Sequence, residues 1–291
     1  MNQGSPILLR VTGDQRLAEE WELVLLAQGL SPSLRRSPDG IVLSVPDAEM
    51  DRALASLSAY EQENPRKVAE QVEPMKAGSV LAGVTLALVL LVFFFVTVQW
   101  LPAPAWFERG SADAQLIIQG ELWRTVTALT LHADVAHVLS NAVAAAVFFS
   151  VLSSMVGAGL GGALVLLAGA GGNLADAFLQ GSPHVAVGAS TAVFGAVGML
   201  GSLGMIRRRR RALSRWRGWL PIAASLALLG MLGSGGERVD IWAHLLGLVV
   251  GAVLGILTAL VAPRAPGAVV QWTCGTAAAA VLIYCWTLAL R

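Results

Sequence analysis

The sequence predicts an all-α polytopic membrane protein, a helical bundle of seven spans, with a small soluble α+β domain at its N-terminus. Of its 291 residues, 55% are hydrophobic and only 13% are charged. Residues 1–76 hold 12 acidic and 8 basic residues, whereas the rest of the chain holds only 7 and 12. Long uncharged runs begin near Ala77. We therefore expect the first part to lie in water and the rest to lie in a bilayer, with the run at Ala77 as an uncleaved anchor.

The first 64 residues alternate between strand and helix patterns. Apolar residues recur at helical spacing after Asp14 and again after Asp47, and a Ser-Pro-Asp-Gly turn joins two extended arms. The order is therefore β-α-β-β-α. The module contains neither histidine nor cysteine, which favours docking or regulation over catalysis. We expect residues 1–64 to bind an unknown cytoplasmic partner and residues 65–76 to form a polar linker.

Seven apolar runs follow, each close to the length that one bilayer crossing needs. The stretch from Val135 to Ala175 carries no charged residue and is twice that length, so we divide it at the glycines after Val156. Six runs would form a core over residues 77–265, and residues 266–291 would add a C-terminal helix. The predicted spans are 78–100, 135–156, 159–179, 190–206, 218–234, 241–262 and 267–290.

Charges at the ends of these runs predict the orientation. Basic residues concentrate on the cytoplasmic side of membrane proteins. If the N-terminal module is cytoplasmic, an arginine-rich group lies inside, and the acids of the membrane part lie at or near the outside. The C-terminus would then be outside, and the protein would be integral to a bacterial inner membrane. The arginines placed inside are Arg207 to Arg211, Arg215, Arg217 and Arg264, and those outside are Arg109, Arg124, Arg238 and Arg291.

Ser190 and His244 are expected at matching depth on two different spans. The run from Ser190 to Arg207 is roughly 26 Å long at 1.5 Å per residue, so Ser190 would lie just below the outer face. His244 stands 20 residues before Arg264, which puts its imidazole at a similar height. A serine hydroxyl becomes a nucleophile when a base accepts its proton, and histidine is the commonest such base.

Other polar residues cluster toward the same face. His137 and Asn141 are one helical turn apart, and intramembrane polar residues usually face a cavity or a partner. His132 could either brace its loop through a hydrogen bond or have a functional role, and the sequence favours neither. We expect His184, in a Ser-Pro-His turn, to be an exposed loop residue. Asp240 either orients His244 or, in the interpretation we favour, caps the helix.

A set of short motifs resembles the rhomboid intramembrane serine proteases. The motifs follow one another over about residues 100–260. The resemblance is to the members with one helix added to a core of six. The matching residues are Trp123-Arg124, His132, His137-x-x-x-Asn141, Gly188-x-Ser190 and Ala243-His244-x-x-Gly247-x-x-x-Gly251.

The resemblance implies a role for each of these residues. Ser190 would be the nucleophile and His244 the general base of a dyad without an acid. His137, Asn141 and the Ser190 amide would form an oxyanion hole. The remaining residues would support the site: His132, Trp123, Arg124, Gly188, Phe194, Gly247 and Gly251. Two positions depart from the family: Thr191 stands where many members have glycine, and Phe194 where a tyrosine often stacks on the imidazole.

The expected activity is hydrolysis of peptide bonds in or near transmembrane segments of membrane proteins, with no cofactor, no metal and no nucleic acid. One alternative is a catalytically inactive membrane chaperone or binding protein of the same fold, although such a protein needs neither Ser190 nor His244. A second alternative is a zinc site formed by His132, His137 and His244.

Overall fold

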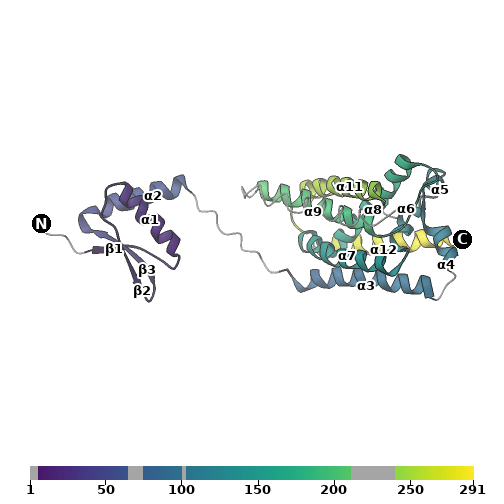
Figure 1. Cartoon of the computed structure of the whole chain (residues 1–291), viewed down its shortest axis with the longest axis horizontal. Helices are drawn as coiled ribbons and strands as arrows, with labels where there is room; N and C mark the ends of the chain where they lie inside the picture. Colours follow the sequence, from purple (N-terminus) through teal and green to yellow (C-terminus); the bar gives the residue numbers. More distant parts are fainter. Residues whose placement is uncertain (1–5, 65–74, 100–102, 211–239) are drawn as a thin grey trace. The chain divides into compact units, whose positions relative to one another are not determined.

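The computed structural model describes residues 6–64, 75–99, 103–210 and 240–291. The chain divides into two compact units, Met1–Val72 and Glu73–Arg291. The first has strands and helices, and the described part of the second is mainly long apolar helices (Figure 1). The predicted fold class, a helical polytopic membrane protein with a small N-terminal α+β part, is confirmed.

The N-terminal unit is a three-stranded antiparallel sheet with two helices. The strand order is β1-β3-β2. Leu17, Trp21 and Leu25 recur every fourth residue on α1, so they share one face, and all three are buried in the core with the strand residue Leu43. The elements are β1 (Pro6–Thr12), α1 (Gln15–Ala27), β2 (Ser33–Ser37), β3 (Gly40–Pro46), η1 (Asp47–Glu49) and α2 (Met50–Glu63).

The membrane unit contains six described helices that are long and apolar enough to cross a bilayer. They correspond to six of the seven predicted spans. The other predicted span, 218–234, lies outside the described residues. The long helices are α3 (Ala77–Gln99), α7 (Val135–Val156), α8 (Ala158–Gln180), α9 (Ser190–Arg210), α11 (Ile241–Val261) and α12 (Ala268–Ala289).

Short elements lie between α3 and α7 and before α9. The first connection holds α4 (Ala103–Gly110), β4 (Ala112–Asp113), α5 (Ala114–Ile118), α6 (Arg124–Thr127) and η2 (Ala128–Thr130), and the second holds β5 (Val185–Ala186). Strands β4 and β5 pair antiparallel, with Ala112 opposite Ala186. A separate hydrogen bond runs from the Gly188 amide to the Ala128 carbonyl in η2 at 2.9 Å. The chain that leads into α9 is therefore fastened to the connection before α7.

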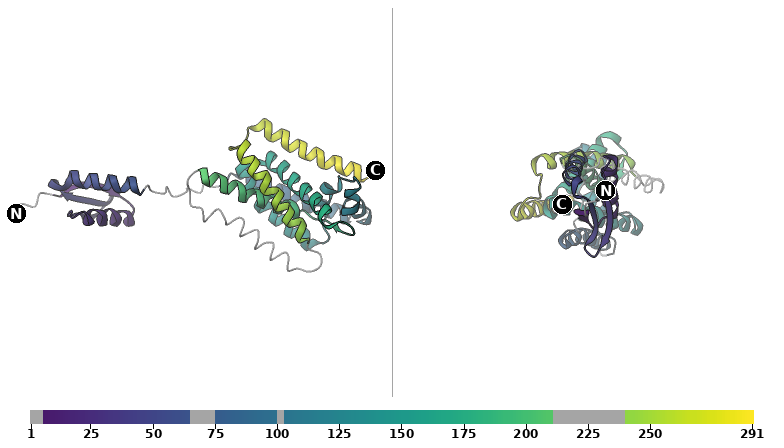
Figure 2. Two further views of the ribbon diagram at one scale, coloured as in Figure 1. Left: turned by 90° about the horizontal axis from the view of Figure 1, so that it is seen from above. Right: turned by 90° about the vertical axis from the view of Figure 1, so that its left-hand side faces the viewer.

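Helix α9 is the central helix of the unit. In its most apolar window 72% of the helix is buried, against 6% for α12, which runs along the edge of the unit (Figure 2). Helices α7, α8 and α11 all contact α9. Because α9 is surrounded by other helices, its first residue, Ser190, lies among other elements rather than at a free surface.

Helices α9 and α11 approach each other through glycines. A methyl group on Gly247 would overlap the backbone carbonyl of Thr191, and one on Gly251 would overlap that of Gly195. Small residues allow two helix backbones to approach this closely within a membrane. Because no side chain separates the two backbones, the residues at their adjacent ends are held at a fixed separation.

Candidate active site

Ser190 and His244 meet at the end of the closely packed pair α9 and α11. The Nε2 atom of His244 lies 2.7 Å from the hydroxyl oxygen of Ser190. Ser190 is the first residue of α9, and His244 is in the first turn of α11. His244 is only 6% exposed. At this distance the hydroxyl donates to Nε2 when the imidazole is neutral with its proton on Nδ1.

A phenyl ring, and no carboxylate among the described residues, contacts the imidazole of His244. Phe194 stacks on it with ring centroids 4.6 Å apart and planes inclined by 23°. The Nδ1 atom is buried and has no hydrogen-bond partner in the described part of the chain. Asp240, one turn earlier, caps α11 instead, accepting from the Ala243 amide at 2.9 Å. Of the two roles considered for Asp240, the structure therefore shows that of the N-terminal cap of α11.

Gly188 brings the chain before Ser190 against His137. Its φ of 126° lies in a region that glycine alone enters without cost. A Cβ atom at Gly188 would lie 2.6 Å from His137 Nε2 and 3.7 Å from Ser190 Oγ. The imidazole of His137 and the hydroxyl of Ser190 therefore border the same small space. A side chain at residue 188 would fill it.

His137 and Asn141 lie one turn apart on α7, as their spacing predicts. The Asp134 carboxylate caps α7 by accepting from the His137 amide at 2.8 Å. Asn141 is 5% exposed, and its side-chain amide donates to the His137 carbonyl at 3.1 Å. A primary amide has two N–H groups, so this bond leaves a second donor on Asn141.

His132 lies in the loop before α7 and is 1% exposed. Its Nε2 atom accepts from the Ala189 amide at 3.4 Å, and its ring meets that of His137 edge to face with centroids 5.1 Å apart. Burial first, and then the nearby His137, lowers the pKa of His132 to about 4. At neutral pH His132 is therefore uncharged, the form in which Nε2 accepts a hydrogen bond.

Arg124 fixes the connection that precedes His132. It is 5% exposed, and its guanidinium donates to Glu121 at 2.6 Å and to the carbonyls of Glu108 and Ser111 at 2.9 and 3.1 Å. Trp123 packs on the cluster around Leu131. These contacts hold the loop itself, and they do not touch Ser190 or His244.

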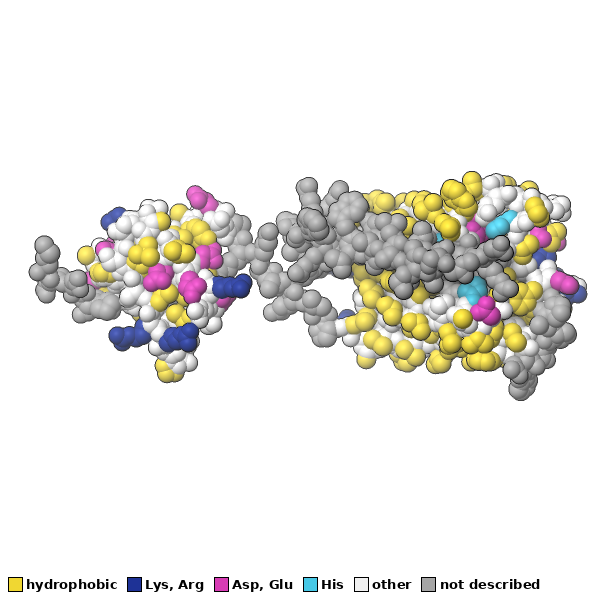
Figure 3. Space-filling model, in the orientation of Figure 1, with side chains coloured by type: hydrophobic (Ala, Val, Ile, Leu, Met, Phe, Trp, Pro, Cys, Tyr) yellow, Lys and Arg dark blue, Asp and Glu magenta, His cyan; other side chains and the backbone are white. Residues whose placement is uncertain are grey.

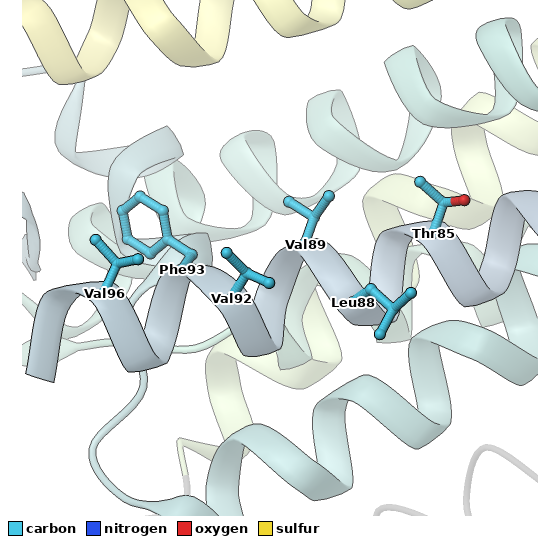
Figure 4. Close-up of a pocket in the computed structure, with 6 residues that line it drawn as sticks. All are labelled: Thr85, Leu88, Val89, Val92, Phe93 and Val96. Carbon is cyan, nitrogen blue, oxygen red and sulfur yellow. The ribbon is translucent and has the colours of Figure 1, made fainter. Parts of the chain in front are cut away.

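Polar side chains gather at one end of the membrane unit. On the face in Figure 3, histidine and acidic side chains of the membrane unit lie toward the end where Figure 1 labels α4 and α5, and most of the other coloured side chains are hydrophobic. A separate hollow of about 360 Å³ lies along α3. It is lined by Thr85 and five apolar side chains (Figure 4), so it contains no titratable group that could act as an acid or base.

A second polar cluster lies beside the first and joins His184 and Asp240 to two residues that the sequence did not single out, Asp176 and Gln180. His184 Nε2 lies 2.6 Å from an Asp240 oxygen and 3.1 Å from an Asp176 oxygen. Gln180 donates to both carboxylates, at 2.8 and 3.1 Å. His184 is thus paired with two acids and is not the exposed loop residue we expected. The signal that could have revealed the cluster is Asp176, a lone acid at the end of an apolar run.

The structure separates the three histidines of the alternative zinc site. Among the described residues, the only three ligand groups that come within 4.8 Å of one another are those of Asp176, His184 and Asp240. The Nε2 atoms of His132 and His244 instead meet the Ala189 amide and the Ser190 hydroxyl. The zinc hypothesis for His132, His137 and His244 therefore has no support in the geometry.

Comparison with known proteins places this site within a described family. A model of the rhomboid domain matches residues 119–260. Rhomboid protease GluP of Bacillus subtilis (strain 168) is 32% identical over 151 residues, which are 50% of this chain and 29% of that protein. The putative rhomboid protease YdcA of the same organism is 27% identical over 174 residues, 59% of this chain and 85% of that protein.

A plant relative also matches about half of the chain. RHOMBOID-like protein 6, mitochondrial, of Arabidopsis thaliana is 33% identical over 161 residues, 54% of this chain and 50% of that protein. The chain thus spans less than a third of the first of these relatives and half of the last. The residues that the rhomboid-domain model matches include every position discussed above from Glu121 to His244. Residues 119–260 form a rhomboid domain, so this part of the chain belongs to the rhomboid family.

Proposed function

We propose that this protein is an intramembrane serine endopeptidase with Ser190 as nucleophile and His244 as general base. The observation that carries the proposal is the 2.7 Å contact between Ser190 Oγ and His244 Nε2. A nucleophile and its base must lie within hydrogen-bonding distance, about 2.6–3.2 Å, for the proton to transfer as the bond forms. Two relatives whose names include "rhomboid protease" support the same reaction class.

The proposed reaction proceeds in two steps. Ser190 Oγ attacks the carbonyl carbon of the scissile bond while its proton passes to His244 Nε2. His244 then protonates the leaving amine, and water hydrolyses the ester by the reverse proton path. In this scheme Phe194 holds the imidazole plane through stacking, which supplies the orientation that a carboxylate provides in a triad.

His137, Asn141 and the Ser190 amide would stabilise the oxyanion. Gly188 leaves a space bordered by His137 and Ser190, and the free N–H of Asn141 is one turn further along the same helix. A pre-positioned donor stabilises the tetrahedral intermediate by about 3–4 kcal/mol. In the proposed scheme His132 positions the chain before Ser190 rather than contacting substrate, because it bonds the Ala189 amide.

The substrate class follows from where the proposed site lies. Ser190 and His244 are near the ends of apolar helices, so the scissile bond would belong to a membrane protein and lie close to the end of its span. We propose the orientation inferred from the arginines: the arginine-rich end of α9, which ends at Arg210, is the cytoplasmic end, and the dyad opens to the opposite side. On this proposal residues 77–265 are catalytic and residues 1–64 bind a cytoplasmic partner.

A serine-reactive fluorophosphonate probe tests the proposal on the purified full chain. We expect labelling of the wild type, loss of labelling in Ser190→Ala, and strong loss in His244→Ala. Ser182→Ala is the matched control because its hydroxyl bonds Gln115 and touches neither residue. A wild type that is folded but unlabelled would indicate a binding protein.

A further inference from the structure

Four side chains from three segments converge beside the proposed dyad. Asp176 and Gln180 lie at the end of α8, His184 lies in the turn before β5, and Asp240 begins α11. The His184 Nε2 atom is 2.6 Å from Asp240 Oδ2 and 3.1 Å from Asp176 Oδ2. The buried carboxylate of Asp176, 3% exposed, receives hydrogen bonds in this cluster.

The position of the His184–Asp240 pair in the chain relates it to the dyad. His184 is six residues before Ser190, and Asp240 is four residues before His244. The pair therefore joins the two segments that lead directly into the helices carrying the nucleophile and the base. The glycine contacts fix α9 against α11 along their length, and the His184–Asp240 bond joins their lead-in segments beyond Ser190 and His244.

Each partner is itself anchored. The His184 carbonyl accepts from the Ala114 amide at 2.9 Å, next to the β4–β5 pairing. Asp240 caps α11 through Ala243, and the His244 amide donates to the Asp240 carbonyl at 3.2 Å. A displacement of Asp240 is thus passed to the backbone of His244 within one helical turn.

We infer that His184 and Asp240 are positioning residues for catalysis: their bond holds the start of α11 so that His244 stays within reach of Ser190. Neither residue touches the reacting atoms. The inference rests on the proposed function, because it assigns the pair a task only if Ser190 and His244 react. A misplacement of about 1 Å in a catalytic group can lower a rate by about a hundredfold. Loss of the single hydrogen bond between His184 and Asp240 is therefore enough to lower the catalytic rate measurably.

Kinetics of three variants test the inference in the full chain. In His184→Ala we expect kcat to fall about ten- to a hundredfold while KM changes less than about threefold, because alignment rather than substrate binding is lost. Asp240→Ser keeps a side chain that can cap the helix but is too short to reach His184. Its kcat should therefore fall as much as that of His184→Ala. His184→Gln retains a side-chain N–H and should recover at least part of the loss.

The double variant His184→Ala/Asp240→Ser checks that the two residues act as one tie. We expect it to lose no more than either single variant, since the bond is already absent in both. Ser182→Ala, in the same turn, is the control and should match wild type. Rates are normalised to the concentration of sites titrated by the fluorophosphonate, and the melting temperature Tm is measured for each variant.

Several outcomes overturn the inference. They are unchanged kcat per titrated site in His184→Ala and Asp240→Ser, a loss confined to Tm, a double variant that loses the product of the singles, or no recovery in His184→Gln. Activity that is lost in chelator and restored by zinc would instead make the cluster a metal site. Failure of the wild type to react with the probe would refute the proposed function, which is a separate result.

Discussion

At the scale of single residues, the proposed chemistry depends on a neutral imidazole. His244 accepts from Ser190 through Nε2, which requires the proton on Nδ1, and that atom has no partner among the described residues. Among the described residues, stacking on Phe194 and the packing of α11 orient the imidazole, and no carboxylate bonds to it.

The oxyanion assignment predicts a specific kinetic pattern. Asn141→Ala should lower kcat about a hundredfold with little change in KM, since the donor binds more strongly as negative charge develops. His137→Ala should behave similarly, and the double variant should lose less than the product of the singles because both donors serve one oxygen. Steady-state kinetics with and without chelator measure this. Full activity in Asn141→Ala, together with inhibition by chelator that zinc reverses, would refute the assignment.

His132 predicts a pH dependence of stability. Its pKa is lowered to about 4 in the folded protein, against about 6.5 in the unfolded chain, so the unfolded state binds the proton more readily. The stabilisation is complete above pH 6.5 and is lost as the pH falls toward 4. Between pH 7 and 5 the free energy of unfolding should drop by up to about 2 kcal/mol from this residue. Denaturation of His132→Gln should show a smaller drop, and an equal drop would contradict the assignment.

At the scale of elements, α12 contacts the loop that carries His132. The Trp286 indole donates to the Thr130 hydroxyl at 3.2 Å and packs against Trp106 and Phe93 with ring centroids 4.7 and 5.4 Å apart. At the other end of α12, Gln271 bonds the Val156 carbonyl and the Leu160 amide across the turn between α7 and α8. The last helix is therefore attached at both ends, although most of its surface is exposed.

Replacing Trp286 tests whether α12 supports the His132 loop. Trp286→Ala should lower the unfolding free energy by about 3–5 kcal/mol and slow the fluorophosphonate reaction, because a buried aromatic ring and a hydrogen bond are both lost. Trp272→Ala, on the same helix but 75% exposed, is the matched control and should change neither. Thermal unfolding in detergent and the labelling rate measure the two effects, and equal behaviour of the two variants would contradict this role for α12.

The long helices were predictable at the scale of elements, and the connections were not. An apolar run such as Val135–Val156 is recognised because it is long and contains no charged residue. Its predicted bounds agree with those of α7. Strands β4 and β5 have two residues each and therefore no periodicity to detect. Their pairing depends on contacts distant in sequence. The partners of His184 are also distant in sequence, and the lone acid Asp176 was the signal that could have pointed to them.

At the scale of the whole molecule, the two units are built on different cores. The N-terminal core is formed by its own strands and helices, and Ser190 and His244 lie in the other unit. The matching depth of two apolar runs predicted that Ser190 and His244 lie level with each other, and the two side chains are in contact at the ends of α9 and α11. The partner that we propose for the N-terminal unit has no comparable signal in the sequence, since a docking surface carries no fixed chemistry.

Deletion of residues 1–64 should leave the chemistry intact, because that segment contributes no group to the proposed site. The shortened chain should react with the fluorophosphonate at the wild-type rate and retain its Tm for the membrane unit. The prediction does not extend to which substrates the shortened protein cleaves or to how much of the protein accumulates in the membrane. A deletion variant that inserts and folds normally but no longer reacts would show that the N-terminal unit is part of the catalytic apparatus.

In the proposed function, Ser190 and His244 act together to cleave membrane proteins. The most direct measurement is cleavage of a co-expressed single-span substrate by the wild type, Ser190→Ala and His244→Ala, with immunoblotting to confirm that each variant is inserted at wild-type level. We predict a cleavage product with the wild type and none with either variant. Cleavage that persists at the wild-type rate in Ser190→Ala or His244→Ala would contradict the dyad.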